Sequence, residues 1–369
     1  MTDSRTYKFA QILIDHSTKV GLGDRVAITA TTAAEPLVRV LYELVLNRGG
    51  YPHILFDLPG QDEILFAHAS DAQLNYVSPF QKAAFQEFDV LIKIRSELNT
   101  RGLSGVDPNR QARRQKAISP LLGAQMRRGA DKTLRWMSTL FPTNAYAMEA
   151  EMGLSEYEDF VYAALHADDH TPDPVAHWQK IEKEQQRIVD RIEGHDQVLL
   201  RGPNVDLSLS IKERTFRNAS GQHNLPDGEI YTGPVEDSAN GWVHYTYPAI
   251  YQGRSVEGIE LTFETGKVVK ANAKRNEEFL LHMLDTDAGA RYLGEFAIGT
   301  NFEIDRFTRN ILFDEKIGGS FHMALGAGYP ETGSQNKSIF HWDMICDMRQ
   351  DAEIRVDGEV VYRDGQFVF

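Results

Sequence analysis

The feature that most limits the fold of this chain is the alternation of strand-like and helix-like segments in its first half. Apolar runs typical of buried strands are separated by longer amphipathic stretches with helical spacing, and this order implies βαβ units with a mostly parallel sheet. The strand-like segments are residues 25–31, 53–58 and 88–96. The helix-like segments include residues 7–22 and 33–50. The sequence therefore predicts an N-terminal parallel-sheet α/β domain.

The pattern changes near residue 195. Residues 177–194 have apolar side chains at helical spacing and end on a glycine, which predicts a helix that links two halves. Beyond it, short β-rich segments alternate with turns, and Asp-Gly and Thr-Gly pairs between them indicate hairpins. We expect an N-terminal domain of residues 1–195 and a C-terminal mixed α+β domain of residues 196–369, with one helix near residues 276–285.

Composition and charge exclude some classes of function. The chain has 369 residues, of which 42% are hydrophobic and 25% charged, as is usual for globular proteins. Its net charge of −14 argues against a general nucleic-acid-binding surface. Gly21 and Gly23 precede a predicted strand instead of following it, so they form no dinucleotide-binding fingerprint. The basic run of residues 109–135 is expected to be a helix whose arginines are solvated or contact acidic neighbours.

The location of the protein is expected to be cytoplasmic. The polar N-terminal segment does not resemble a signal peptide, and the chain contains no uninterrupted apolar run of about 18 residues, so no association with a membrane is expected. The single cysteine, Cys346, cannot form an intrachain disulfide, which agrees with a reducing compartment. We expect Cys346 to be a small buried residue and not a nucleophile.

Histidines and carboxylates are concentrated in the second half of the chain. In an extended strand His341 and Asp343 would point to the same side, since side chains alternate between faces. Imidazoles together with carboxylates suit divalent ions such as zinc, cobalt or manganese, and this set exceeds what one tetrahedral ion uses. Any one of these residues taken alone is more often structural, but their joint presence favours a site with two metals. The residues concerned are Glu229, Glu295, Glu315, His322, Tyr329, His341 and Asp343.

The segments that carry these residues resemble the thermophilic-type metalloaminopeptidases, in the order and spacing of that family. The resemblance covers most of the chain and includes PDGE-TGP, AKRNEEFL-DTDAGARYLGE, NILFDEK-GGSFHMALGAGY and HWDMICD. It implies a two-metal aminopeptidase, with a homodimer as the expected assembly. The metal ligands that it implies are Glu229, Glu295, Glu315, His322, His341 and Asp343.

The resemblance also implies catalytic roles. Tyr329 corresponds to the family's catalytic tyrosine and would donate a hydrogen bond to the developing oxyanion. Glu295 or Glu315 would bind metal or move a proton, and these two roles stay open for both residues. A pair of ions would activate a water molecule and polarise the scissile carbonyl. The expected substrate is a peptide with a free N-terminus, whose α-amine lies near one metal.

Two other classes of function remain open at this point. His322, His341 and Asp343 alone would form the two-histidine, one-carboxylate face of a mononuclear iron ring-opening dioxygenase, although the remaining carboxylates and Tyr329 have no use in such a site. A non-catalytic metal-binding protein is the other alternative. Further acidic and basic residues nearby, Asp285, Asp287 and Arg291, are more simply read as turn residues and an ion pair.

Overall fold

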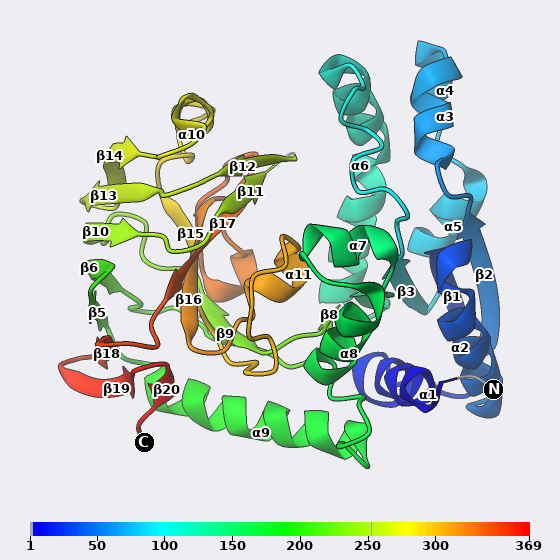
Figure 1. Ribbon diagram of the computed structural model, residues 1–369, viewed down its shortest axis with the longest axis horizontal. Coiled ribbons are helices and arrows are strands. Elements are labelled where there is room, and N and C mark those ends of the chain that lie inside the picture. Colours follow the sequence, from blue (N-terminus) through cyan, green and yellow to red (C-terminus); the bar gives the residue numbers. More distant parts are fainter. Residues whose placement is uncertain (1–2, 252) are drawn as a thin grey trace. The chain divides into compact units, whose positions relative to one another are not determined.

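The structure is a computed structural model that describes residues 3–251 and 253–369, and its chain forms two compact units (Figure 1). Unit 1 comprises residues 1–179 and 221–226, and unit 2 comprises residues 180–220 and 227–369. The units divide inside helix α9 (Pro174–Ile192), which confirms the helix expected near residues 177–194. The domain boundary after residue 195 stays a prediction.

Unit 1 contains the parallel sheet that the sequence predicts. Its strands pair in the order β2-β1-β3-β4-β8, and all of these pairs are parallel. The strands are β1 (Arg25–Thr31), β2 (Tyr51–Asp57), β3 (Val90–Arg95), β4 (Arg135–Leu140) and β8 (Asn224–Leu225). The helices are α1 (Ser4–Gln11), α2 (Glu35–Asn47), α3 (Gln61–His68), α4 (Asp71–Leu74), α5 (Pro79–Gln86), α6 (Pro108–Ala130), α7 (Asn144–Glu149) and α8 (Leu154–Ala164). A π-helix, Ile12–Ser17, continues α1, and a 3₁₀ turn, Thr32–Ala34, precedes α2.

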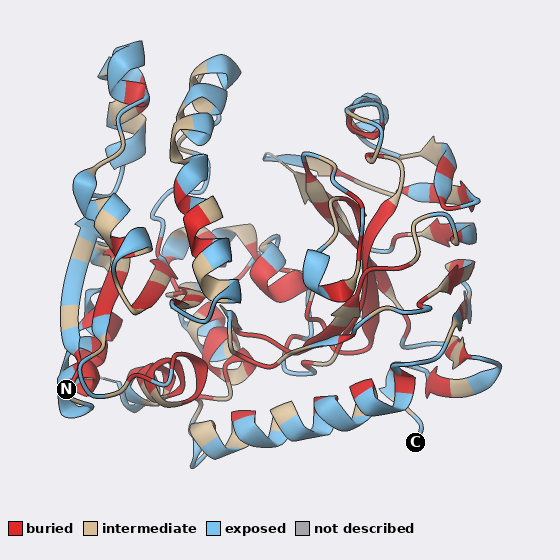
Figure 2. Ribbon diagram, turned by 180° about the vertical axis from the view of Figure 1, so that it is seen from behind, coloured by how far each residue is buried: buried red, intermediate tan, exposed pale blue. Residues whose placement is uncertain are grey.

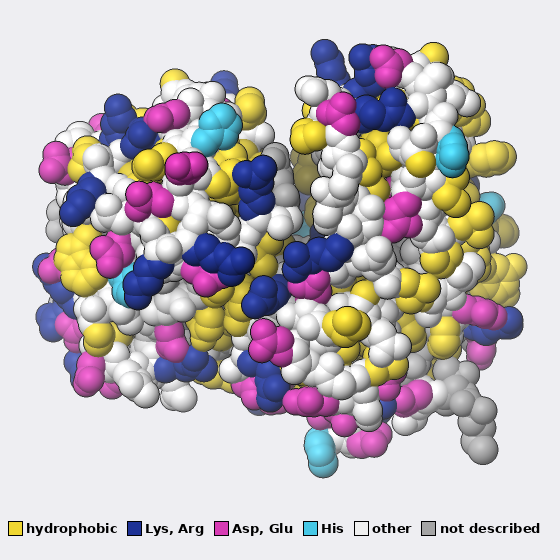
Figure 3. Space-filling model, turned by 45° about the horizontal axis from the view of Figure 1, so that its top comes forward, with side chains coloured by type: hydrophobic (Ala, Val, Ile, Leu, Met, Phe, Trp, Pro, Cys, Tyr) yellow, Lys and Arg dark blue, Asp and Glu magenta, His cyan; other side chains and the backbone are white. Residues whose placement is uncertain are grey.

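The prediction of a single helix over the basic run was wrong at its end. Helix α6 stops at Ala130, and Arg135 already opens β4. Lys132 adopts a left-handed conformation with φ of 56°, which an α-helix cannot continue through. Within α6 the arginines do contact an acidic neighbour, since Arg113 lies 3.1 Å from Asp71. Figure 3 shows Lys and Arg side chains next to Asp and Glu side chains on this part of unit 1.

Unit 2 is built from antiparallel sheets. The first has eight strands in the order β14-β13-β10-β6-β5-β18-β19-β20, the second has five in the order β17-β16-β15-β9-β7, and β11 pairs with β12. The eight-stranded sheet comprises β5 (Gln197–Gly202), β6 (Val205–Ser210), β10 (Asn240–His244), β13 (Glu260–Glu264), β14 (Lys267–Asn272), β18 (Glu353–Val356), β19 (Glu359–Arg363) and β20 (Gln366–Phe367). The other strands are β7 (Arg217–Ala219), β9 (Glu229–Thr232), β11 (Ala249–Tyr251), β12 (Arg254–Val256), β15 (Leu293–Gly299), β16 (Ser320–Gly326) and β17 (His341–Asp347).

The structure confirms the turn and the helix that the sequence predicts in this half. The pair Asp357-Gly358 turns the chain between β18 and β19, and both residues have positive φ, 47° and 89°. The predicted helix is α10 (Glu277–Leu284), and a one-turn helix α11 (Ile311–Asp314) and a 3₁₀ turn (Pro330–Thr332) follow later. Among the helices of the described ranges, none is both long and apolar enough to cross a membrane.

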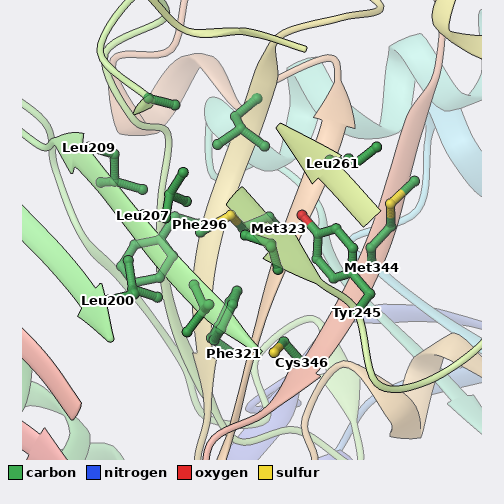
Figure 4. Packing of buried hydrophobic residues seen from close by; sticks show 14 of the residues in the cluster. Leu200, Leu207, Leu209, Tyr245, Leu261, Phe296, Phe321, Met323, Met344 and Cys346 are labelled. Atoms are coloured by element: carbon green, nitrogen blue, oxygen red, sulfur yellow. The ribbon is translucent and has the colours of Figure 1, made fainter. Parts of the chain in front are cut away.

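The core of unit 2 lies between its two large sheets. Figure 4 shows Leu200, Leu207 and Leu209 of the eight-stranded sheet packed near Phe296 and Phe321 of the five-stranded sheet. Every residue of β15 and β16 is buried, as the continuous red strands of Figure 2 show. Because side chains from both sheets fill this layer, the strands of the five-stranded sheet are fixed from one side.

Other side chains of this core include Met323, Met344 and Cys346 (Figure 4). Cys346 has no exposed surface, as expected from the sequence, and burial raises the pKa of its thiol. A thiol with a raised pKa is a poor nucleophile, because the reactive form is the thiolate.

We predict that Phe321→Ala lowers the free energy of unfolding by about 3–5 kcal/mol, because Phe321 has no exposed surface and its loss leaves a cavity. Phe80→Ala is the matched control, since 73% of Phe80 is exposed, and we expect it to change stability by about 0.5 kcal/mol or less. Chemical denaturation followed by tryptophan fluorescence measures both. Equal losses for the two variants would contradict the assignment of this core.

Candidate metal centre

The register of the five-stranded sheet brings three candidate ligands to one face. Glu295 in β15 lies opposite Ala324 in β16, which lies opposite Asp343 in β17. In the next row of that face, Ala297 lies opposite His322. Residues that face each other across antiparallel strands point to the same side, as do residues two apart in one strand. Glu295, His322 and Asp343 therefore project from the same face of the sheet.

Two further strand positions and one helix end complete the set. His341 stands two residues before Asp343 in β17, and Glu229 in β9 lies opposite Gly299 in β15. Glu315 directly follows helix α11 as its C-cap residue. The structure thus brings together all six residues proposed from the sequence as metal ligands, namely Glu229, Glu295, Glu315, His322, His341 and Asp343.

The opposite face of the same strands is apolar. A β-bulge in β15 separates a residue that points to this apolar face from one that points to the ligand face. Leu293 lies opposite Leu325, and both are buried in the core between the sheets. The register then shifts, so that Glu295, two residues later, lies opposite Ala324 on the other face. An extra residue in one strand reverses the side to which the following side chains point. The core packing described above therefore also fixes the strands that carry the polar groups.

The ligand atoms lie within contact distance of one another. The Nε2 atom of His341 is 3.1 Å from Glu295 Oε2 and 3.2 Å from Asp343 Oδ1. The Nε2 atom of His322 is 3.4 Å from Glu229 Oε2 and 3.8 Å from Glu295 Oε1. Glu295 therefore lies between the two imidazoles, with one oxygen toward each.

The donors fall into two groups that share one residue. Glu295, His341 and Asp343 form the first group, and Glu315, His322 and Asp343 form the second, with the ligand atoms of each within 4.8 Å of one another. Each group of one imidazole and two carboxylates has the composition of a catalytic site for a divalent ion with open positions. The residues present therefore fit a centre with one or two metal ions.

The orientation of His341 suits a ligand. Its Nδ1 lies 2.7 Å from the backbone oxygen of Ala327, and because a carbonyl only accepts, Nδ1 carries the proton and donates it. Nε2 is then free to bind a metal in the neutral imidazole. A hydrogen bond of this kind to the second ring nitrogen is the usual way in which a metal-binding histidine is oriented.

Protonation follows from the burial and the mutual charges of these groups. Burial raises the pKa of Glu229 to about 8, although nearby Lys316 opposes this. Burial acts against the charged form of His322, yet the carboxylates of Glu295 and Glu229 raise its pKa to about 9. Burial likewise opposes ionisation of Asp343, but His341 lowers its pKa to about 2. Protonated imidazoles therefore balance the carboxylates in the metal-free protein, and a bound cation would take over this charge.

Tyr329 lies beside the group on its more exposed side. Its ring centroid is 5.3 Å from that of His341 and 5.5 Å from that of Tyr231, and 38% of Tyr329 is exposed. Desolvation of the hydroxyl and the charges of Glu295 and Asp343 raise its pKa well above the ordinary value. The phenol therefore stays protonated near neutral pH and remains a hydrogen-bond donor.

The sequence reasoning missed one residue of the site, Lys316. Its side chain has no exposed surface, and its Nζ contacts Glu229 Oε1 at 3.0 Å and also donates to Glu315 Oε1. Asp227 Oδ1 is 4.0 Å away. The only signal for this residue was the position of a lysine directly after Glu315 in the run LFDEK. Its contact with Glu229 depends on the tertiary fold, because the two residues are 87 positions apart.

The residues read as structural from the sequence have structural roles. Arg291 forms an ion pair with Asp285, with 2.7 Å between Nη2 and Oδ1. Asp287 accepts hydrogen bonds from the backbone nitrogens of Gly289 and Ile339, at 2.8 and 2.9 Å. These contacts confirm the expected ion pair and turn, and neither carboxylate belongs to the groups of candidate ligands.

Solved structures with the same fold include two enzymes. Wild-type AmpT from Thermus thermophilus superposes with a TM-score of 0.86 at 23% identity, over 99% of each chain. The 2,5-dihydroxypyridine dioxygenase of Pseudomonas putida superposes with a TM-score of 0.56 at 13% identity, over 99% of this chain and 96% of the other. At these identities the likeness concerns the fold alone.

Sequence comparison identifies the family. Aminopeptidase 2 of Geobacillus stearothermophilus is 27% identical, covering 98% of this chain and 97% of its own length. Aminopeptidase T of Thermus thermophilus is 26% identical, covering 97% of this chain and 95% of its own. The family model for thermophilic metalloproteases (M29) matches residues 2–367, almost the full length. This chain therefore belongs to the thermophilic metalloprotease (M29) family.

Proposed function

We propose that this chain is an aminopeptidase that binds two divalent metal ions and removes the first residue from peptides with a free α-amine. The coarser statement is established, because membership of the family and the aminopeptidase relatives make the chain a metallo-aminopeptidase. The number of ions, the ligand set and the roles of the side chains are the parts that we propose.

The observation that carries the proposal is the pair of ligand groups that share Asp343. One carboxylate between two ions is a common way to hold a dinuclear centre, in which the ions lie about 3.5–4 Å apart. Charge supports the same count. The ligand carboxylates Glu229, Glu295, Glu315 and Asp343 would carry four negative charges when ionised, and the ammonium of Lys316 balances one of them. A single divalent ion would still leave one negative charge uncompensated among these largely buried groups.

The proposed ligands divide between the ions as the geometry suggests. Glu295, His341 and Asp343 would hold one ion, and Glu315, His322 and Asp343 the other, with Glu229 beside His322. Imidazole and carboxylate donors fit zinc, cobalt or manganese. When bound, such ions supply an activated water molecule and polarise the scissile carbonyl.

The remaining chemistry belongs to side chains. We propose that Tyr329 donates a hydrogen bond to the carbonyl oxygen of the substrate, a contact that strengthens as negative charge develops on it. Its raised pKa keeps this proton available. Glu295 is the proposed residue that binds metal or moves a proton, because its two oxygens face different imidazoles. Several carboxylates beside a partly exposed His341 would also favour the positively charged amine of a substrate.

The dioxygenase and the non-catalytic metal-binding protein were the alternatives. His322, His341 and Asp343 are all present, but Glu229, Glu295 and Glu315 share the same cluster and would have no function at a single iron. Established membership of a metallopeptidase family disfavours both alternatives. A cytoplasmic location, a homodimer and the lack of nucleic-acid or membrane partners stay predictions from the sequence.

The first test uses a matched pair of substrates. We expect the metal-loaded protein to hydrolyse an aminoacyl anilide with a free amine and to leave its N-acetylated analogue intact. A chelator should abolish the activity, and zinc, cobalt or manganese should restore it. Efficient cleavage of the acetylated compound would indicate an amidase or endopeptidase instead.

A second test concerns the shared ligand. Wild-type protein should bind about two divalent ions per chain. Asp343→Ala should reduce the content of both ions, because Asp343 belongs to both ligand groups. Asp285→Ala is the control, since Asp285 forms an ion pair with Arg291, belongs to neither ligand group and should leave both ions bound. Elemental analysis after dialysis measures this, and a saturating content of one iron per chain would favour the dioxygenase.

A third test separates chemistry from metal binding. Tyr329→Phe should keep both ions and a nearly unchanged KM, but lower kcat by about 10²-fold to 10³-fold, the usual loss for one oxyanion donor. Tyr76→Phe, at a surface position with 65% exposure, should keep full activity. If the Tyr329 variant retained its kcat, another group would have to hold the oxyanion. If it lost metal, the tyrosine would belong to the ligands.

A further inference from the structure

Lys316 is a cation enclosed by the acidic side of the candidate metal centre. Its side chain has no exposed surface, whereas lysines are rarely buried without a partner. The Nζ atom lies 3.0 Å from Glu229 Oε1 and 4.0 Å from Asp227 Oδ1, and it also hydrogen-bonds Glu315 Oε1. The ammonium therefore joins two of the proposed ligands, one from β9 and one from the end of α11.

The position of this ammonium is set by the backbone. The amide of Lys316 donates to Phe313 O at 2.9 Å, and its carbonyl accepts from the amide of Asn301 at 3.1 Å. The side chain of Asn301 donates to Asp227 O at 2.9 Å, so it ties the lysine to the segment that enters β9. Gly228, between Asp227 and Glu229 in the chain, adopts φ of 125°. A Cβ atom on this residue would lie 2.8 Å from the Cβ of Asn301. Only glycine fits this approach.

Lys316 engages one carboxylate oxygen of each of its two glutamate partners. Glu229 gives Oε1 to Lys316, while its Oε2 lies 3.4 Å from His322 Nε2 and has no hydrogen bond of acceptable geometry among the described residues. Glu315 gives Oε1 to the same ammonium, and it also offers a carboxylate oxygen to the group with His322 and Asp343. Each carboxylate thus has one oxygen engaged by the lysine.

We propose that Lys316 is a positioning residue for the metal centre: by engaging one oxygen of Glu229 and one of Glu315, it makes both carboxylates bind metal through a single oxygen each. The inference rests on the proposed function and assigns a role to a residue outside the ligand set. Partners that orient metal ligands commonly change metal affinity by about 10–100-fold when they are removed.

If Lys316 acted only through its charge, its removal would change the metal affinity in the opposite direction. A positive charge about 3 Å from a ligand oxygen repels a divalent ion, so removal of the charge alone should strengthen metal binding. Removal of an orienting donor should weaken it, because Glu229 and Glu315 would repel each other and lose their fixed geometry. The direction of the change in affinity therefore distinguishes the two roles.

The test measures the zinc affinity of metal-free protein by competition with a chromogenic chelator. For Lys316→Met, which is close in volume and uncharged, we expect binding of the more weakly held ion to fall by about 10–100-fold. Asp227→Asn is combined with it to restore the local charge, since Asp227 is within 4.0 Å of Nζ and belongs to neither ligand group. The double variant should bind zinc no more tightly than the single one if orientation matters.

The outcomes separate this inference from the proposed function. If wild-type protein itself fails to bind two ions, the proposed function is wrong. If wild type binds two and Lys316→Met binds them equally or more tightly, or if Asp227→Asn restores the affinity, the positioning role is overturned. Should the methionine variant not fold, Lys316→Gln keeps an uncharged donor at the same place. It should bind zinc more tightly than the methionine variant but no more tightly than wild type, and zinc affinity above that of wild type there also overturns the role.

Discussion

The constraint on which the rest of the site depends is the burial of several carboxylates on one face of a single sheet. Isolated buried charges cost several kcal/mol each, so such a group is stable only when cations or protons neutralise it. In the metal-free protein His322, His341 and Lys316 provide this balance. The raised pKa of His322 and the lowered pKa of Asp343 are two results of the same attraction. A metal ion would replace the imidazole protons but not the charge of the lysine.

The apolar face of the sheet allows this arrangement. Strands β15, β16 and β17 bury Phe296, Phe321, Met323, Trp342 and Met344 in the hydrophobic core of unit 2. Because side chains alternate between faces, a strand that is anchored in this way cannot slip by one residue without exchanging its apolar and polar sides. Core packing therefore fixes the register, and the register fixes which carboxylates face which imidazoles. The packing that stabilises the core therefore also determines the geometry of the site.

Much of this was accessible from the sequence, for physical reasons that differ between elements. The parallel sheet of unit 1 follows from apolar runs separated by helices, and His341 and Asp343 share a face because strand periodicity is local. The end of α6 at Ala130 was missed, because the left-handed turn at Lys132 leaves no strong signal in the sequence. Lys316 was missed because its main partner, Glu229, meets it only through pairing of distant segments.

The two sides of the cluster differ in a way that bears on how a substrate would enter. On the inner side Lys316 has no exposed surface, and only 7% of the Glu229 side chain is exposed. On the outer side 25% of the His341 side chain and 38% of Tyr329 are exposed. The proposed oxyanion donor thus lies beside His341, the most exposed of the six proposed ligands, whereas the Glu315 side chain is 16% exposed. A scissile carbonyl arriving from that side would meet Tyr329 and the metal bound by His341 together, whereas the ligands held by Lys316 would stay behind them and keep their geometry.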